Sequence, residues 1–365
     1  MCMPGRIHSP FIFHREQNDQ LLDSPSKPLL LKFRLLGQLS RRFPIILIFK
    51  KMKIILKYIL FLLGAITLWS CEDVIQVDLP KSEPVVVVDA WLNDKPEVQK
   101  IEVLKTIPYF ENSYLPGLSN AIVRVEDLSD NVAYTFEQAD EEGVYLWEPT
   151  ASQPAFGKVG NNYRLSIQIG SDIYESFSSM NRVPEIDSIS FRFEEGNSFF
   201  PDSYFAGFYA TDPVGPGDAY WIKAWKNGMY LNQPSEINIS YDAGGSPGAI
   251  VDGIVFIQPI RDGINPFDED ENDEFLPPYE PGDSVYVELH SINYDSYTFL
   301  NEVAIQTNRP GGFAELFAQP LANVSSNINA VNESSGTTKV IGFFNISAVS
   351  SLGRKLDPNN LPSKD

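Results

Sequence analysis

The fold of this chain is constrained most by a series of short runs in which apolar and polar residues alternate. In residues 163–169 one face is formed by Tyr163, Leu165, Ile167 and Ile169, and this period of two is typical of a half-buried β-strand. Turn-forming residues such as Asp130-Asn131 separate such runs. The pattern predicts a mainly β protein. Further runs with β-branched or alternating residues occupy residues 85–88, 98–104, 121–127, 132–136, 143–147, 186–193, 205–210, 220–225, 284–289 and 340–346.

One helix is expected among these strands. Tyr297, Leu300 and Ala304 lie on one stripe of residues 294–308, which is the spacing of an amphipathic helix. The run ends at Pro310-Gly311-Gly312, and proline and glycine are common just beyond a helix. The sequence therefore predicts a helix from residue 294 to about residue 308.

The strand series divides at residues 180–185, a segment that contains Pro184. We predict an N-terminal immunoglobulin-like or transthyretin-like β-sandwich, followed by a second β-rich domain with one helix. The expected parts of the chain are a non-native or disordered extension (1–51), a lipoprotein signal peptide (52–70), a tether (71–82), the sandwich (83–182), the second domain (183–350) and a disordered tail (351–365).

Cys71 closes a short apolar run in the manner of a bacterial lipid attachment site. The run, residues 58–69, is too short for a membrane-spanning helix, which needs about 20 apolar residues, and has the length of a signal-peptide core. Leu68 and the small Ser70 precede the cysteine as in a lipobox, although Trp69 is bulkier than the usual residue. We expect a covalent lipid on Cys71; the alternative is a buried free cysteine.

Residues 1–51 do not fit a signal peptide, because they place a long stretch with Pro, Arg and His ahead of the charged region at Lys51, Lys53 and Lys57. We therefore expect translation to start at Met52 rather than Met1. A disordered extension is the alternative.

The expected mature chain is strongly acidic. Residues 1–70 hold 11 of the 28 Lys and Arg residues and 3 of the 48 Asp and Glu residues, which leaves 17 against 45, a formal charge of −28. Such a surface repels phosphate backbones, so the sequence excludes nucleic acid as a partner. It also opposes adsorption to anionic lipid, so stable membrane attachment would rest on more than one acyl chain.

Few residues suited to catalysis follow the anchor. Beyond Cys71 the chain has no cysteine, and His290 is its only histidine, which argues against disulfide frameworks and Cys/His zinc sites. Residues 244–248 spell a Gly-x-Ser-x-Gly nucleophile elbow around Ser246, but Pro247 lacks the backbone N–H that an oxyanion hole needs. We expect a loop there and a structural His290. A hydrolase is a distant alternative.

An acidic run at residues 268–274 is the weak candidate for a calcium site. Asp268, Asp270 and Asn272 alternate as ligands do in calcium loops. The sixth position is Asp273 instead of glycine, and the twelfth is Tyr279 instead of glutamate, so an EF-hand is not predicted. A solvated acidic loop is the expected alternative.

Aromatic residues crowd the predicted second domain and include a candidate ligand or partner surface. Exposed Trp and Tyr rings could stack on sugars or anchor a protein contact, whereas most such rings fill cores. Tyr220 and Trp221 are neighbours, so in a strand they face opposite ways, and only a sheet covered on both faces buries both. The candidates are Tyr220, Trp221, Trp225 and Tyr230.

Several segments resemble a family of Bacteroidota lipoproteins, the domain of unknown function 4249. The resemblance spans roughly residues 71–350 and rests on loose turn-and-strand patterns rather than on a catalytic signature. It implies an outer-membrane lipoprotein, often encoded near a TonB-dependent transporter, with no established activity. The segments are residues 71–79, 85–89, 160–165 with Tyr174, 282–285, 320–328 and 342–344.

These observations together predict a lipid-anchored protein that binds rather than catalyses. We expect it in the outer membrane as an accessory to a TonB-dependent transporter, with a glycan or peptide as a further candidate ligand. Glu72 and Asp73 directly follow the anchor, and acidic residues there accompany export to the cell surface in the lipoproteins that this chain resembles, so the cell surface is favoured over the periplasmic face. The alternative function is a glycan-binding or adhesive surface module.

Overall fold

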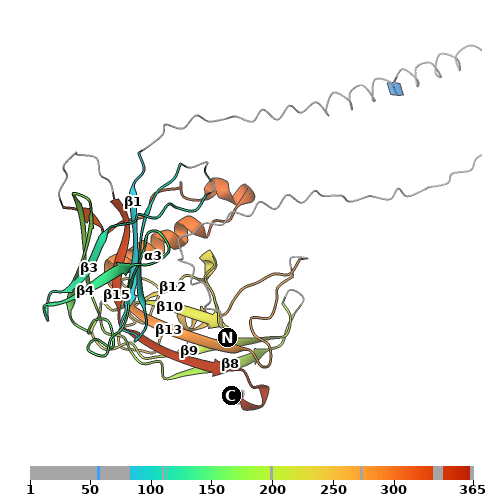
Figure 1. The fold of residues 1–365 in the computed structure, drawn as a ribbon. Coiled ribbons are helices and arrows are strands. Elements are labelled where there is room, and N and C mark those ends of the chain that lie inside the picture. The colour runs from blue at the N-terminus through green and yellow to red at the C-terminus, as the bar shows by residue number, and fades with distance from the viewer. Residues whose placement is uncertain are drawn as a thin grey trace, which may run out of the picture. The chain divides into compact units, whose positions relative to one another are not determined.

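The computed structural model describes residues 56–57, 83–108, 111, 113–197, 200–271, 274–331 and 340–361. These residues form a mainly β protein, as the alternating runs predict (Figure 1). The predicted extension, signal peptide and tether, with Cys71, lie outside the described residues apart from Leu56 and Lys57. None of the helices in the described part is both long and apolar enough to cross a bilayer.

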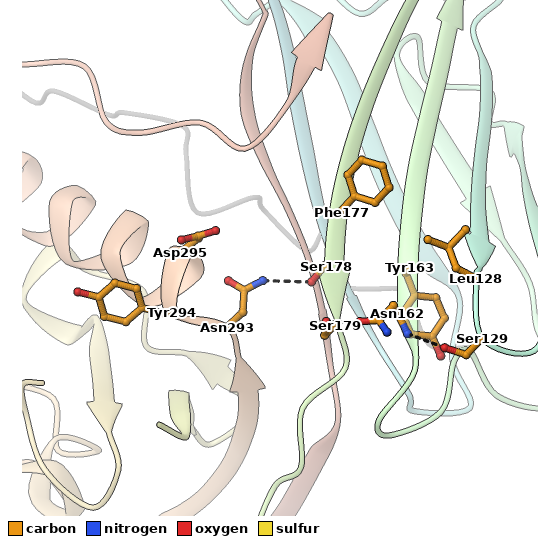
Figure 2. A pocket seen from close by; sticks show the side chains of 10 residues that line it. All are labelled: Leu128, Ser129, Asn162, Tyr163, Phe177, Ser178, Ser179, Asn293, Tyr294 and Asp295. Carbon is orange, nitrogen blue, oxygen red and sulfur yellow. Dashed lines mark hydrogen bonds between the residues drawn. The ribbon is translucent and has the colours of Figure 1, made fainter. Parts of the chain in front are cut away.

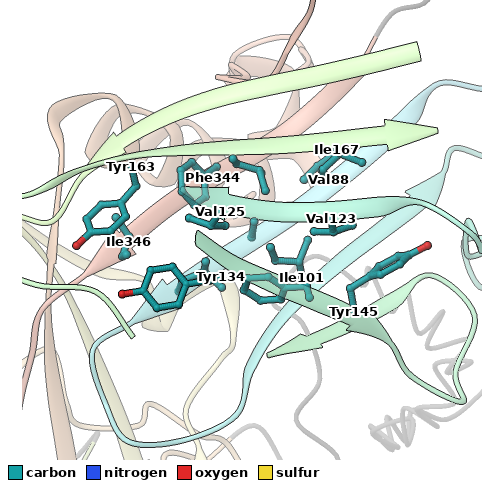
Figure 3. Close-up of a cluster of buried hydrophobic side chains, with 14 of the residues drawn as sticks. Val88, Ile101, Val123, Val125, Tyr134, Tyr145, Tyr163, Ile167, Phe344 and Ile346 are labelled. Atoms are coloured by element: carbon teal, nitrogen blue, oxygen red, sulfur yellow. The ribbon is translucent and has the colours of Figure 1, made fainter. Parts of the chain in front are cut away.

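The largest sheet has nine strands and encloses the first hydrophobic core (Figure 3). Alternate residues of each strand point inward, for example Val123 and Val125 of β3, and are fully buried. The strand order is β14 (Asn329–Ala330), β7 (Asp172–Ser179), β6 (Asn162–Ile169), β3 (Ile122–Asp127), β4 (Val132–Gln138), β5 (Val144–Trp147), β2 (Gln99–Lys105), β1 (Val86–Asn93) and β15 (Val340–Ser347).

The two ends of this sheet are linked by side-chain hydrogen bonds, so the sheet nearly closes on itself. Ser178 Oγ of β7 accepts the Ile346 N–H of β15 at 3.3 Å. Asn327 lies just before β14, and its side-chain amide donates to the Phe344 carbonyl and accepts the Phe344 N–H. The backbone carbonyl of Asn327 accepts from Ser176 Oγ of β7. Closing a sheet satisfies edge groups that would otherwise be open to other strands.

A second sheet and a hairpin build the other core. The sheet has the order β11 (Met229–Tyr230), β10 (Ala219–Lys226), β13 (Ser284–Ile292) and β16 (Val349–Lys355), with β12 (Asn238–Tyr241) also paired to β10. The hairpin is β8 (Ser188–Glu194) and β9 (Ser203–Tyr209), and the short helix α2 (Gln258–Asp262) lies beside it. Phe191, Phe208, Phe256 and Tyr279 are among the side chains that fill this second core.

A layer of aromatic rings joins β1 and β15 to β10 and to helix α3 (Tyr294–Thr307). Trp91 lies edge-on to Trp221, with centroids 5.1 Å apart, and stacks on Phe343 at 5.5 Å. Phe299 of α3 stacks on Phe343 at 4.5 Å. Strand β10 is therefore covered on both faces, since Tyr220 faces the second core while Trp221 faces this layer.

Strand β15 runs parallel to β1, and its approach is tight at Gly342. Gly342 pairs with Val88 and has a φ of 123°. A Cβ on Gly342 would lie 1.9 Å from the Val88 carbonyl oxygen. Only glycine suits this conformation and this contact.

The strand pairing crosses the predicted division at residues 180–185. Strands β14 and β15 follow this segment in the chain but belong to the sheet of β1–β7. The sequence also predicts a disordered tail from residue 351, whereas residues 349–355 form β16 and pair with β13. A division based on chain order cannot anticipate such long-range pairings.

The predicted helix is confirmed as α3, and its first turn shows why it begins where it does. Asn293 is the N-cap, and its Oδ1 accepts the Ser296 N–H at 2.8 Å. The remaining short helical turns of the described chain are the 3-10 segments Pro234–Glu236, Gly312–Phe317 and Pro358–Asn360.

Candidate functional site

A surface pocket of about 680 Å³ lies where β6, β7 and the turn after β3 meet the start of α3. In Figure 2, Asn293, Tyr294 and Asp295 stand on one side, with Phe177 and the residues of the other strands opposite. No sequence motif marked this pocket, because its residues come from four separate segments. The lining is Leu128, Ser129, Asn162, Tyr163, Phe177, Ser178, Ser179, Asn293, Tyr294 and Asp295.

The turn after β3 is held by a buried carboxylate. Asp127 is 3% exposed and accepts the Asn161 amide at 2.8 Å, together with the backbone N–H groups of Ser129 and Asp130. Burial by itself would raise the pKa of Asp127, but these hydrogen bonds lower it below its ordinary value. The charged side chain thus fixes the turn that presents Leu128 and Ser129 to the pocket.

The opposite wall is fixed by the cap of α3. Asn293 accepts from Ser296 at both the backbone N–H and the Oγ, and its Nδ2 donates to Ser178 Oγ of β7 at 3.3 Å. The Tyr294 ring is flanked by Tyr297 at 6.4 Å and by Tyr241 at 5.8 Å. The helix start is therefore held against the sheet by the cap itself, and the Tyr294 ring has a defined orientation.

The pocket combines exposed apolar surface with uncharged polar groups. Phe177, Tyr294 and Leu128 are 58%, 55% and 44% exposed, although large apolar side chains usually lie inside. Asp295 is the single charged residue of the lining. A molecule bound at this open surface pocket would meet ring faces and a few polar groups.

The aromatic residues singled out in the sequence lie elsewhere. Tyr220 and Trp221 are 0% and 5% exposed, so neither offers a ring face to a ligand, and the expectation of a surface formed by these two is wrong. The reason is the cover on both faces of β10. Trp225 and Tyr230 are half-buried and pack on each other with centroids 4.9 Å apart.

A buried ionic cluster ties β13 to the segment after β1. Glu288 is 5% exposed; its carboxylate lies 2.5 Å from Lys95 Nζ and accepts from His290 Nε2 at 2.8 Å. Burial alone would raise the pKa of Glu288, but His290 and Lys95 lower it to about 2. Burial lowers the pKa of Lys223 to about 8, and its Nζ lies 4.0 Å from the Trp221 ring centroid.

His290 should make the folded protein less stable in mild acid. Burial and the charges of Lys223 and Lys95 outweigh the opposing effect of Glu288 and lower the pKa of His290 to about 4, whereas an unfolded histidine titrates near 6.5. The unfolded chain therefore takes up a proton first, and the free energy of unfolding should fall by roughly 3 kcal/mol as the pH falls from about 6.5 to 4. Denaturant melts at several pH values measure this loss.

The matched variant is His290→Gln, which keeps a side-chain amide to donate to Glu288. Because His290 is the only histidine after residue 14, the variant should flatten the stability profile in this pH range. An unchanged slope in the variant would contradict a neutral, buried His290.

Ser246 and His290, the residues of the distant hydrolase alternative, are not joined by any hydrogen bond in the described chain. Ser246 is in an exposed loop, whereas His290 is 4% exposed and bonded to Glu288. The helix that a nucleophile elbow requires does not follow Ser246, since residues 249–257 are irregular.

Asp268 and Asp270, two of the predicted calcium residues, belong to a small acidic hairpin. The Asp270 N–H donates to the Glu274 carbonyl, and Asp270 Oδ1 accepts the Glu274 N–H at 3.0 Å. Asp268 accepts from the Gln233 side chain at 3.1 Å. Asn272 lies outside the described residues, so the calcium site stays a prediction.

Three other acidic residues bring their carboxylates close to one another in the fold. Asp212, Asp242 and Asp252 each bring a carboxylate oxygen within 4.8 Å of the other two. Burial, followed by the charges of Asp218 and Asp242, raises the pKa of Asp212. Carboxylate oxygens are ligands that Ca²⁺ favours, but each of the three also holds a loop by accepting a backbone N–H. Those donors are Gly253 for Asp212, Gly217 and Asp218 for Asp242, and Gly215 for Asp252.

Comparison with known proteins identifies a family for this chain but indicates no activity. No significant match to a curated protein is found. Residues 72–352, well over half of the chain, match a family described as a domain of unknown function, DUF4249. The match includes every strand that contributes to the pocket. On this evidence the chain belongs to the DUF4249 family, as the turn-and-strand resemblance predicted.

Proposed function

We propose that this protein is a lipid-anchored binding protein of the outer membrane and that it has no catalytic role. The observation that carries the proposal is the order of features at residues 52–71: lysines, a short apolar run, a small residue and then Cys71. Acyl chains on Cys71 would hold a strongly acidic, folded body at a bilayer that its own charge would otherwise avoid.

The anchor gives the binding function its physical basis. A protein confined to the membrane plane meets a membrane partner at a raised effective concentration, so even a weak contact is occupied. We propose a TonB-dependent transporter as that partner and the cell surface as the location, in line with the Bacteroidota lipoproteins that the chain resembles and with Glu72 and Asp73 after the anchor.

The pocket beside α3 supports a second candidate, a glycan-binding surface module. Its exposed rings, Phe177 and Tyr294, take the place of Tyr220 and Trp221, whose burial removes them as a ligand surface. Both candidates share the anchor and differ in whether the ligand is a protein or a sugar.

Metabolic labelling tests the anchor. Cells fed an alkyne analogue of palmitate should label the wild-type protein, and Cys71→Ala should reduce the label to background because the acceptor sulfur is lost. From Met52 onward Cys71 is the only cysteine of the sequence, so no other thiol of that product can take the label. A Cys71→Ala protein that still carries the label would overturn the proposal.

A further inference from the structure

The pocket beside α3 offers ring faces on both of its sides. Phe177 projects from the outer face of β7, because the neighbouring positions 176 and 178 point inward and are buried. Tyr294 opens α3, and its ring is braced by Tyr241 and Tyr297. A flat ring that is exposed yet braced loses little conformational entropy when a second flat, apolar surface covers it.

The polar groups of the lining are arranged around these rings, and some have no partner inside the protein. The Asn162 side chain accepts from Ser179 Oγ at 2.6 Å, which orients the amide and leaves its N–H donors without an acceptor among the described residues. The Asp295 carboxylate and the Tyr294 hydroxyl make no hydrogen bond within the described residues. A ligand thus meets amide donors, a carboxylate acceptor and a phenol.

The charge of the residues that line the pocket disfavours anionic ligands. The lining contains neither Lys nor Arg nor His, and Asp295 is negative, so phosphates and carboxylates are disfavoured. A peptide added as a strand is also disfavoured at β6, because β6 is already paired with β3 on one side and with β7 on the other. The ring faces, with polar groups that both donate and accept hydrogen bonds, favour a ligand that has apolar faces and hydroxyl groups.

We propose that this pocket binds a neutral carbohydrate, with a sugar ring packed on Tyr294 and Phe177 and its hydroxyls bonded to Asn162 and Asp295. The C–H face of a pyranose supplies the flat apolar surface, and its hydroxyls both donate and accept. The inference names the ligand class of the second candidate proposed above, the glycan-binding surface module, and rests on that candidate.

The experiment is a titration of the detergent-solubilised full-length protein with neutral trisaccharides, namely maltotriose, cellotriose, xylotriose and chitotriose, followed by saturation-transfer NMR. At least one should bind, with transfer strongest to the C–H protons of one ring face. Tyr294→Ala should weaken that binding about tenfold, because the larger ring platform is lost. Tyr114→Ala is the matched control, since Tyr114 is also exposed, at 75%, and lies outside the pocket.

Asp295→Asn gives a second readout that does not depend on the Tyr294 variant remaining folded. The wild-type protein should bind a neutral trisaccharide better than tri-galacturonate, and Asp295→Asn should narrow that difference because it removes the repelling charge. The proposal would be overturned if none of the four neutral sugars binds, or if wild type and Tyr294→Ala bind equally well. It would also be overturned if Tyr114→Ala weakens binding as much as Tyr294→Ala does. These results leave the palmitate label on Cys71 unaffected, so a failure here is distinguishable from failure of the anchor.

Discussion

Gly342→Ala should destabilise the folded protein by about 3 kcal/mol or more, which is among the largest effects expected from a single added methyl group. The backbone at Gly342 has a φ of 123°, where a residue with a Cβ is strained. The new Cβ would lie 1.9 Å from the Val88 carbonyl oxygen, and backbone cannot move aside as a flexible side chain can. Strands β1 and β15 would have to separate at this point.

Urea melts of the purified protein measure this effect, and Gly353→Ala is the control. Gly353 is also a strand glycine, in β16, but its Cβ would lie 3.4 Å from the Tyr286 ring and 3.7 Å from the Val285 carbonyl oxygen, which are ordinary contacts. The control should change the free energy of unfolding by less than about 1 kcal/mol. Equal stability of the two variants would contradict the parallel pairing of β1 with β15.

Trp221→Ala should cost about 3–5 kcal/mol of stability, because it removes a buried indole from the layer between the two sheets. Trp221 is 5% exposed; its ring contacts Trp91 at 5.1 Å, and Lys223 Nζ lies over its face at 4.0 Å. The cavity would open at the point where β10 meets β1, so the loss should be cooperative and should appear as a single, shifted melting transition.

Trp225→Ala is the matched control for this prediction. Trp225 lies in the same strand and is half-buried against Tyr230 and Tyr286, so its loss should cost clearly less than that of Trp221. If Trp221→Ala were as stable as wild type, the indole would not be a core residue, and a ligand-binding role for it would have to be reconsidered.

The strands of this fold are predictable from sequence where burial is one-sided. Strand β6 keeps strict alternation, with Tyr163, Leu165 and Ile167 inside, because one face lies on the core and the other faces water. Strand β10 lacks that pattern, since it is covered on both faces and buries Tyr220 and Trp221 together. Alternation reports local burial and contains no information about which sheet a strand joins.

The pocket was not predictable, for a related reason. The Asp130-Asn131 turn and the start of α3 were each expected from local signals, namely turn residues and helix spacing. Their proximity depends on Asn293 bonding Ser178, a contact between residues 115 positions apart. The exposure of Phe177 is likewise set by tertiary packing, because an isolated strand sequence does not show which of its apolar residues faces outward.

The most direct test of the anchored binding protein is the mass of the N-terminal peptide of the protein purified from membranes. If the chain is cleaved before Cys71 and acylated there, the first residue is Cys71 and the N-terminal peptide carries the added mass of a diacylglycerol thioether. A peptide that begins upstream of Cys71, or an unmodified Cys71 at the N-terminus, would contradict the account.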